Sequence, residues 1–310
     1  MCCLFGFVDY GHQLSRKQRS RLLTVLSTAC EERGTDATGI AYNSDGKLHI
    51  FKRPLPAHLM WYRVPKDATV VMGHTRMTTQ GDARLNQNNH PFPGRTPDHR
   101  FALAHNGVLF NDKLLRKKYK LPATNVETDS YVAVQLLEQY GSMNFDSLGY
   151  MAEQLEGSFT FTVLDDRDSL YFVKGSNPMC IYHYPKAGVY VYASTEEILR
   201  SAMLKTLLYL GKPEKIRLYG GDILRIDVHG SIARGCFDDS KLYASFFDPY
   251  PWDGWQQESI PRPYAEEPDY LDDLKAVASC YGLYPEDVDA LLADGVSMDE
   301  IEEYIYSCCG

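Results

Sequence analysis

The stretch Thr69-Val70-Val71-Met72-Gly73-His74-Thr75-Arg76 begins as an apolar run and ends in polar residues. A second stretch of the same kind, Phe101-Ala102-Leu103-Ala104-His105, is followed directly by Asn106-Gly107. Short apolar runs of this length are typical of strands that are buried on both faces. We therefore predict two core strands, each with polar side chains at one end.

Apolar spacing and turn residues predict the elements upstream of these strands. Leucines and other apolar residues at helical spacing predict a helix over about residues 13–32, which Arg33-Gly34 ends. Two alternating runs, residues 39–42 and 47–51, flank Asp45-Gly46. Because Asp-Gly favours tight turns between strands, these runs predict a β-hairpin.

Downstream, the chain mixes helices with short strands. Helices are expected over residues 129–140, 145–155 and 196–205. Strands are expected over residues 158–164, 170–174, 180–184, 189–193, 222–226 and 231–236. Antiparallel strands with few helices, rather than strict strand–helix alternation, favour an α+β fold of stacked layers over a doubly wound sheet.

The end of the chain differs in composition from the rest. Residues 246–268 are rich in proline and tryptophan, which is typical of a linker or of a strap on the surface. Residues 269–310 are acidic and predict three short helices over 270–281, 285–293 and 297–306. We expect a main domain over residues 2–245, and the acidic region is either a partner-binding module or an extension packed on that domain.

Charge and hydropathy exclude several classes of function. The 310-residue chain has a net charge of −9 and no long block of lysine and arginine, so nucleic-acid binding is not expected. No apolar run is long enough for a transmembrane helix. The N-terminus lacks the basic and apolar regions of a signal peptide, so we expect a cytoplasmic protein without membrane contact.

The eight cysteines are expected to be free thiols, because no secretion signal is present. They occupy positions 2, 3, 30, 180, 236, 280, 308 and 309. No CxxC pair or zinc-ligand spacing occurs, and nothing demands a metal site that joins the vicinal pairs 2–3 and 308–309. No P-loop or other Gly-rich nucleotide motif occurs either, so we expect no metal and no cofactor.

Cys2 is the cysteine with a chemical role to consider. Removal of Met1 would leave a thiol and a free α-amine on the same residue. An α-amine has a pKa of about 8, so it can act as a general base toward the thiol near neutral pH. The thiolate could then attack a carbonyl group without any histidine. Alternatively, Cys2 is simply a small residue near a chain terminus.

Polar residues near the predicted strand ends suit a zwitterionic amino acid. Arg76 could bind an α-carboxylate and Asp129 an α-ammonium group. The Asn106 side chain and the Gly107 N–H could stabilise an oxyanion. Each residue also has a structural alternative, because Asn-Gly is a common turn, an arginine often forms a salt bridge, and an aspartate often caps a helix.

Five motifs occur along the chain in one order. They are Met1-Cys2-Cys3-Leu4-Phe5-Gly6, the segment 32–40 (Glu-Arg-Gly-Thr-Asp-Ala-Thr-Gly-Ile), the segment 73–81 with Asn89-His90-Pro91-Phe92, Ala104-His105-Asn106-Gly107, and Glu127-Thr128-Asp129-Ser130. Together they resemble the glutaminase domain of class II, or N-terminal nucleophile, glutamine amidotransferases. This type of domain is found in amidophosphoribosyltransferase and glucosamine-6-phosphate synthase, and the resemblance covers about residues 2–236.

The resemblance implies a fold and a set of catalytic residues. The implied fold is the four-layer αββα sandwich of the Ntn hydrolases, here with a small C-terminal helical appendage. Cys2 would be the nucleophile, with its own amine as base, and Asn106 and Gly107 would form the oxyanion hole.

The resemblance also implies how the substrate L-glutamine is held. Arg76 and Asp129 would bind the two backbone charges of glutamine, and Thr79 would lie near its carboxylate. Arg33 and His90 would position the loop around the nucleophile.

Three positions depart from the family pattern. Cys3 replaces the usual glycine, which adds a second thiol beside the nucleophile. Met77 and Gln80 replace an aromatic residue and a histidine that are common in the synthase branch, so assignment to that branch is weaker.

The resemblance predicts a glutaminase that forms a Cys2 thioester and releases glutamate and ammonia. Only about 45 residues follow the proline-rich segment, too few for an ammonia-consuming domain, so we expect a separate synthase to accept the ammonia. One alternative is hydrolysis of another γ-glutamyl amide, since the scissile carbonyl is the same. Another is a non-catalytic glutamine sensor or scaffold.

Overall fold

The computed structural model describes residues 2–244, 275, 285–293, 296 and 301. The chain divides into two units, Met1–Tyr250 and Pro251–Gly310, which we treat separately. The predicted linker 246–268 lies outside the described residues, as do the predicted helices 270–281 and 297–306 apart from Lys275 and Ile301.

In the second unit, helix α8 (Pro285–Ala293) confirms the helix predicted over residues 285–293. Val288 and Ile301 are buried there in a small apolar cluster.

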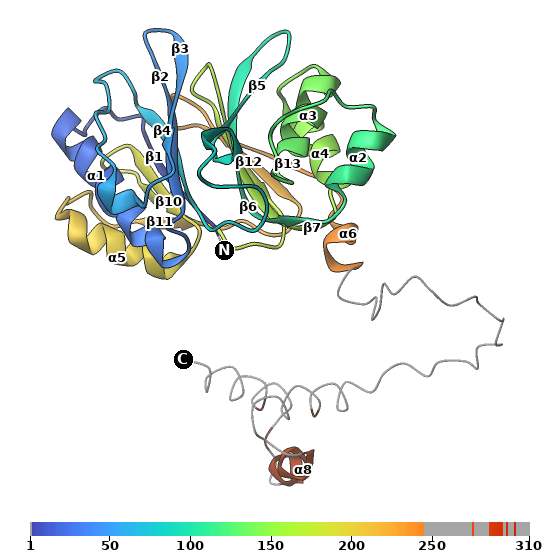
Figure 1. Ribbon diagram of the computed structural model, residues 1–310. Coiled ribbons are helices and arrows are strands. Elements are labelled where there is room, and N and C mark those ends of the chain that lie inside the picture. Colours follow the sequence, from blue (N-terminus) through green and yellow to red (C-terminus); the bar gives the residue numbers. More distant parts are fainter. Residues whose placement is uncertain (1, 245–274, 276–284, 294–295, 297–300, 302–310) are drawn as a thin grey trace. The chain divides into compact units, whose positions relative to one another are not determined.

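Two antiparallel sheets form the centre of the first unit (Figure 1). The first sheet has the strand order β11-β9-β10-β1-β4-β2-β3. Its strands are β1 (Cys3–Asp9), β2 (Ala37–Ser44), β3 (Lys47–Arg53), β4 (Val70–Arg76), β9 (Cys180–Tyr184), β10 (Val189–Ala193) and β11 (Glu214–Ile216). The second sheet has the order β13-β12-β8-β7-β6-β5. Its strands are β5 (Phe92–Arg95), β6 (Arg100–Leu109), β7 (Gly157–Asp165), β8 (Leu170–Lys174), β12 (Asp222–Ile226) and β13 (Ile232–Cys236).

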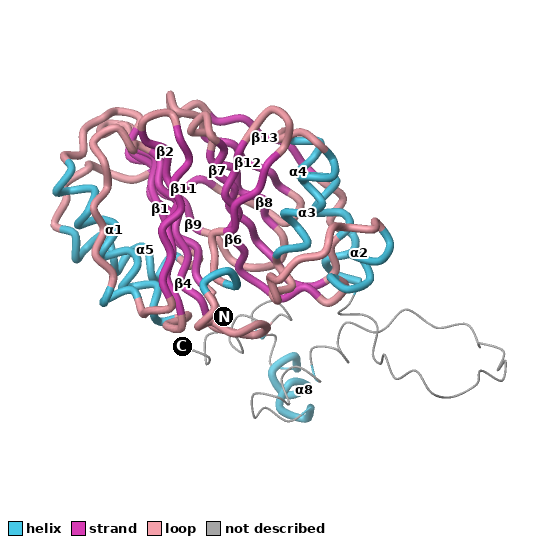
Figure 2. The backbone as a smooth tube through the Cα atoms, turned by 45° about the horizontal axis from the view of Figure 1, so that its top comes forward, coloured by secondary structure: helices cyan, strands magenta, loops and turns pink. Residues whose placement is uncertain are grey.

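Helices cover the outer face of each sheet, as Figure 2 shows. The first sheet is covered by α1 (Arg16–Ala29) and α5 (Glu196–Thr206). The second is covered by α2 (Asp112–Lys118), α3 (Tyr131–Tyr140) and α4 (Phe145–Gln154). Short elements complete the unit: η1 (Cys30–Glu32), η2 (Ala57–Leu59), η3 (Asn86–Asn88) and α6 (Ser240–Ala244). The predicted α+β fold with αββα layers is confirmed. No helix in the described part of the chain is long and apolar enough to cross a membrane.

Strand β1 shows why the core strands are apolar on both faces. Cys3, Phe5 and Phe7 pack with the helices α1 and α5, whereas Leu4 and Val8 pack between the two sheets. Side chains of a strand alternate between faces, so a strand with helices on one side and a sheet on the other buries every residue. All seven residues of β1 are buried.

Of three local predictions, the structure confirms one and changes the bounds of the other two. The predicted hairpin is confirmed, and its turn residues Asp45 and Gly46 both have positive φ, as a tight hairpin turn requires. Helix α1 begins at Arg16, later than predicted, because Ser15 caps it in a capping box. The strand predicted to end at His105 continues to Leu109, because β6 stays paired with β7 along this length.

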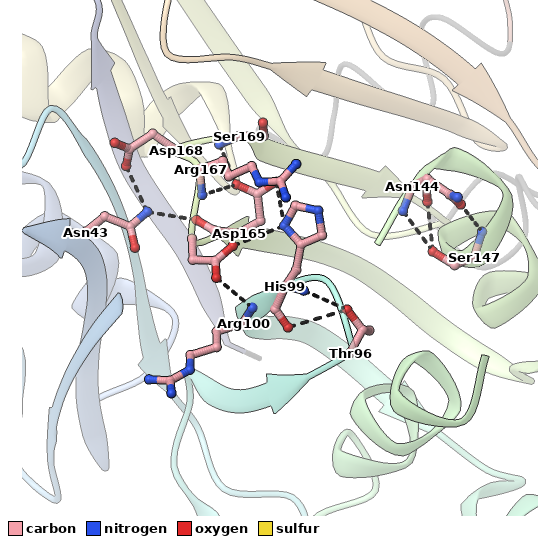
Figure 3. A network of polar contacts seen from close by, with 11 residues as sticks. Asn43, Thr96, His99, Arg100, Asn144, Ser147, Asp165, Arg167, Asp168 and Ser169 are labelled. Carbon is pink, nitrogen blue, oxygen red and sulfur yellow. Dashed lines mark hydrogen bonds and ion pairs between the residues drawn. The ribbon is translucent and has the colours of Figure 1, made fainter. Parts of the chain in front are cut away.

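A polar network joins the two sheets at the end of β6 that is remote from Asn106 (Figure 3). The amide Nδ2 of Asn43, on β2, donates to the carbonyl oxygen of Asp165 at 2.8 Å and to Oδ1 of Asp168 at 2.9 Å. The Asp165 carboxylate accepts the backbone N–H groups of Arg167 and Ser169. One asparagine of the first sheet thus fastens the β7–β8 turn of the second sheet.

Replacing Asn43 with alanine is expected to lower the free energy of unfolding by about 1–3 kcal/mol, because the change leaves buried acceptors without a donor. Urea unfolding followed by circular dichroism measures the effect. Gln87→Ala is the control, since Gln87 is exposed and its loss should change stability by less than about 0.5 kcal/mol. Equal stability of the Asn43→Ala protein and the wild type would contradict this role.

Candidate active site

Cys2 lies directly before β1, at the point where β1 meets the end of β4. The pairing of Cys3 with Thr75 brings Cys2 beside Arg76 and Met77. The Cys2 thiol lies 3.5 Å from the Met77 carbonyl oxygen, and the Cys2 carbonyl oxygen accepts a hydrogen bond from Arg33 Nε at 3.0 Å. The contact with Arg33 supports the positioning role predicted for that residue.

A small, narrow cavity opens beside the thiol. Its lining comprises Cys2, Arg76, Met77, Thr79, Gln80, His90, His105, Gly107, Thr128, Asp129 and Ser130. Five of the six residues predicted for the site therefore share one cavity. The sixth, Asn106, is not in the lining but is the strand neighbour of Gly107.

The interpretation of Asn106-Gly107 as a turn is wrong, because both residues lie inside β6 and pair with β7. Asn106 is fully buried, and neither its Nδ2 nor its Oδ1 has a hydrogen-bond partner among the described residues. A buried amide without a hydrogen-bond partner costs folding free energy. The free Nδ2 donor of Asn106 therefore indicates that a bound ligand supplies the acceptor.

Gly107 cannot be replaced without a clash. Its φ is 147°, and a Cβ atom there would lie 1.9 Å from the carbonyl oxygen of Ser158. Only glycine therefore permits this close approach of β6 to its neighbour in the sheet.

Arg76, the last residue of β4, is buried but has no carboxylate at salt-bridge distance in the described part of the chain. Its Nη1 donates to Asn89 Oδ1 at 2.6 Å, and its Nη2 donates to the carbonyl oxygens of Gln80 and Gly81 at 2.6 and 3.1 Å. The structural alternative of a salt bridge is therefore wrong. Burial lowers the pKa of Arg76, although a guanidinium stays charged near neutral pH.

Asp129 precedes α3 and does not cap it, because the N-cap residue is Ser130. One carboxylate oxygen accepts the backbone N–H of Leu109 at 2.6 Å, and the other accepts the Ser130 hydroxyl at 3.2 Å. The Ser130 hydroxyl also lies 2.8 Å from Nδ1 of His105. Asp129 is 3% exposed, and no ion pair joins it to a described residue. It is a buried anion oriented by two hydrogen bonds at the wall of the cavity.

The thiol is surrounded by groups that are poor bases. Burial raises the pKa of Cys2, and the charge of Arg76 only partly opposes this effect. Burial also lowers the pKa of His105, and it lowers the pKa of His90 well below the usual value and that of His74 to about 3. Neutral imidazoles with such low pKa values accept protons weakly near pH 7. These imidazoles are therefore poorly suited to take the proton of the thiol.

Reasoning from the sequence missed His105, Thr128 and Ser130 as residues of the cavity wall. All three residues stand in the same motifs as Asn106 or Asp129. Their position next to these residues in the sequence could have predicted their place in the cavity. Thr79, which was predicted, is exposed at the mouth of the cavity. In the part of the chain that the structure describes, no three His, Cys, Asp or Glu side chains are grouped as a metal site.

Two solved structures share the fold. Glutamine phosphoribosylpyrophosphate amidotransferase from B. subtilis superposes with a TM-score of 0.59 at 20% sequence identity, covering 76% of this chain and 49% of that one. A structure described as the allosteric regulatory enzyme of purine biosynthesis gives a TM-score of 0.61 at 19% identity, with the same coverage. The fold of two antiparallel sheets with helices is similar to the fold of these two structures.

Sequence comparison finds similarity to glutamine amidotransferases. Residues 61–208 match the model of a glutamine amidotransferase domain. Glutamine–fructose-6-phosphate aminotransferase (isomerizing) from Staphylococcus epidermidis is 30% identical over 190 residues, which are 58% of this chain and 30% of the relative. The enzyme of the same name from Geobacillus kaustophilus is 31% identical over 190 residues, with the same shares.

Residues 61–208 are thus similar to a glutamine amidotransferase domain, in agreement with the resemblance that the motifs carry. It spans 30% of the length of the curated relatives that it matches. The matched family segment contains Arg76, Gly107 and Asp129 but begins after Cys2. The roles of the individual residues therefore remain predictions.

Gly107→Ala is expected to destabilise the domain by several kcal/mol or to prevent folding, because the new methyl group would overlap the Ser158 carbonyl oxygen. Gly149→Ala is the matched control. A Cβ at Gly149 would meet its nearest atoms at 3.7 Å, so alanine in this helix should be neutral or stabilising by about 0.5–1 kcal/mol. Thermal unfolding measures the melting temperatures of both variants. Equal melting temperatures would contradict the predicted clash at Gly107.

Proposed function

We propose that this domain hydrolyses the side-chain amide of L-glutamine through a thioester on Cys2. The observation that carries the proposal is the composition of one cavity. It combines a thiol, a buried cation without a carboxylate partner and a buried anion without a cationic partner among the described residues. Arg76 and Asp129 thus complement the carboxylate and ammonium groups of an α-amino acid.

The chemistry follows from these groups once Met1 is removed. The freed α-amine takes the proton of the Cys2 thiol, which the buried histidines are poorly suited to do, and the thiolate attacks the γ-carbonyl carbon. Asn106 and Gly107 stabilise the negative charge that develops on the carbonyl oxygen. The amine then protonates the departing ammonia, and water hydrolyses the thioester to give glutamate and free Cys2.

We further propose that a separate synthase accepts the ammonia. The curated relatives are named as aminotransferases acting on fructose 6-phosphate, and this chain matches 30% of their length. That partial coverage supports an acceptor activity outside the domain described here.

The central test incubates the purified chain with glutamine and follows glutamate and ammonia. Cys2→Ala is expected to lower turnover at least about 10³-fold, because no second thiol lines the cavity among the described residues. Intact mass must show that Met1 is absent, since a retained methionine would block the amine as an amide. Turnover of other γ-glutamyl amides but not of glutamine would select a different substrate. Binding of glutamine without turnover by correctly processed protein would instead indicate a sensor or scaffold.

Asp129→Asn is expected to raise KM for glutamine about 10- to 100-fold, because a charge-assisted contact with the ammonium group is worth about 1.5–3 kcal/mol. Steady-state kinetics at saturating and limiting glutamine separate this effect from a change in kcat. Asp146→Asn is the control, since Asp146 is exposed in the first turn of α4. An unchanged KM would remove Asp129 from the substrate site.

A further inference from the structure

Two further thiols, those of Cys3 and Cys30, lie close to each other next to Cys2. Cys3 Sγ lies 2.9 Å from Cys30 Sγ, and both residues are 0% exposed. Cys3 is the first residue of β1, and Cys30 is the first residue of η1, directly after α1. The two are 27 residues apart in sequence. The fold therefore brings together two thiols that no sequence motif connects.

The geometry suits a disulfide better than a metal site. A disulfide bond is about 2.05 Å long, so the two sulfur atoms need to approach by less than about 1 Å. No third His, Cys, Asp or Glu side chain joins the pair to make a metal site among the described residues. Both thiols belong to the apolar core between the first sheet and its helices, and Cys3 also has the Ser194 hydroxyl as a polar neighbour.

The pair is connected to the nucleophile by two short routes. Cys3 is bonded directly to Cys2, and Arg33, three residues after Cys30, donates to the Cys2 carbonyl oxygen. In addition, the Thr75 hydroxyl donates to the Cys30 carbonyl oxygen at 3.0 Å, and Thr75 pairs with Cys3. A bond between the two sulfur atoms would therefore move or restrain both supports of Cys2.

We propose that Cys3 and Cys30 form a reversible disulfide that switches off the site beside them. The oxidant is a hydroperoxide: each thiol gives up one hydrogen atom, the sulfur atoms join, and hydrogen peroxide is reduced to two molecules of water. A dithiol reductant reverses the reaction. A displacement of the nucleophile by as little as about 1 Å can lower the rate about 10²-fold, so a small closure has a large effect.

The surroundings predict slow formation of this bond. Burial raises the pKa of the Cys30 thiol well above its usual value. For Cys3, burial is outweighed by hydrogen bonds from Cys30 and Ser194, which lower the pKa of the thiol, and the thiolate is the reactive form. Both thiols also need a local opening to meet the oxidant. The disulfide should accordingly form under sustained exposure to peroxide and persist until a reductant gains the same access.

The bond is tested by treating the full chain with hydrogen peroxide, blocking free thiols, and mapping peptides without reduction. Trypsin leaves Cys2 and Cys3 in one peptide, so the mapping is repeated on Cys2→Ala protein, where only Cys3 can link to Cys30. A cross-link between these two peptides in both proteins is expected. Its absence, or its loss in Cys2→Ala, overturns the proposal.

The effect on the site rests on the proposed glutaminase function and has its own test. Peroxide should lower wild-type glutamine turnover at least about 10-fold, and dithiothreitol should restore it. Under the same treatment, Cys30→Ala should retain more activity than the wild type. Cys180→Ala is the control and should lose activity as the wild type does. Cys180 is a buried thiol of the same core, without a neighbouring sulfur among the described residues. Equal loss of activity in wild type and Cys30→Ala overturns the switch.

The two tests fail independently. A reduced protein without glutaminase activity would reject the proposed function, while peptide mapping would still decide whether the disulfide forms. A cross-link that leaves turnover unchanged would overturn the switch and leave the proposed function standing. If Cys30→Ala does not fold, mapping and the recovery of wild-type activity by reductant still decide the outcome.

Discussion

The antiparallel pairing of β1 with β4 is the constraint on which the candidate site depends. In an antiparallel pair, the start of one strand lies beside the end of the other. Cys3 pairs with Thr75, so Cys2 at the start of β1 meets Arg76 at the end of β4. Cys2 thereby lies buried in the domain, held between two strands. Burial on both faces of β1 holds this position.

The second sheet supplies the remaining groups. Strand β6 carries Gly107 to the cavity and holds Asn106 beside it, and the loop before α3 delivers Asp129, whose carboxylate accepts the Leu109 N–H at the end of β6. Each sheet thus contributes part of the cavity, and neither contributes enough alone. The Asn43 contacts at the far end of β6 matter for the same reason, because they help to fix one sheet against the other.

Local sequence patterns predicted most helices and strands but not the contacts between them. The hairpin around Asp45-Gly46 was predictable because its signal is contained within a few residues. The turn assigned to Asn106-Gly107 was wrong because pairing with β7, about 50 residues later, overrides the local preference of Asn-Gly. The contact between Cys3 and Cys30 was equally invisible, since it depends on how α1 packs on β1. The site residues were found through ordered motifs, and spacing alone would have left each with its structural alternative.

The cavity also shows a conflict between stability and function. The Asn106 amide is buried without partners among the described residues, and Asp129 is buried without a cation. A buried amide without a hydrogen-bond partner costs about 1–3 kcal/mol of folding free energy, and a buried carboxylate without a cation is also costly. An apolar core of the same shape would avoid both costs. A ligand that supplies an ammonium group and a carbonyl oxygen would offset both costs on binding. Selection for stability alone would not keep these groups unpaired, so their retention is itself an argument that the cavity receives such a ligand.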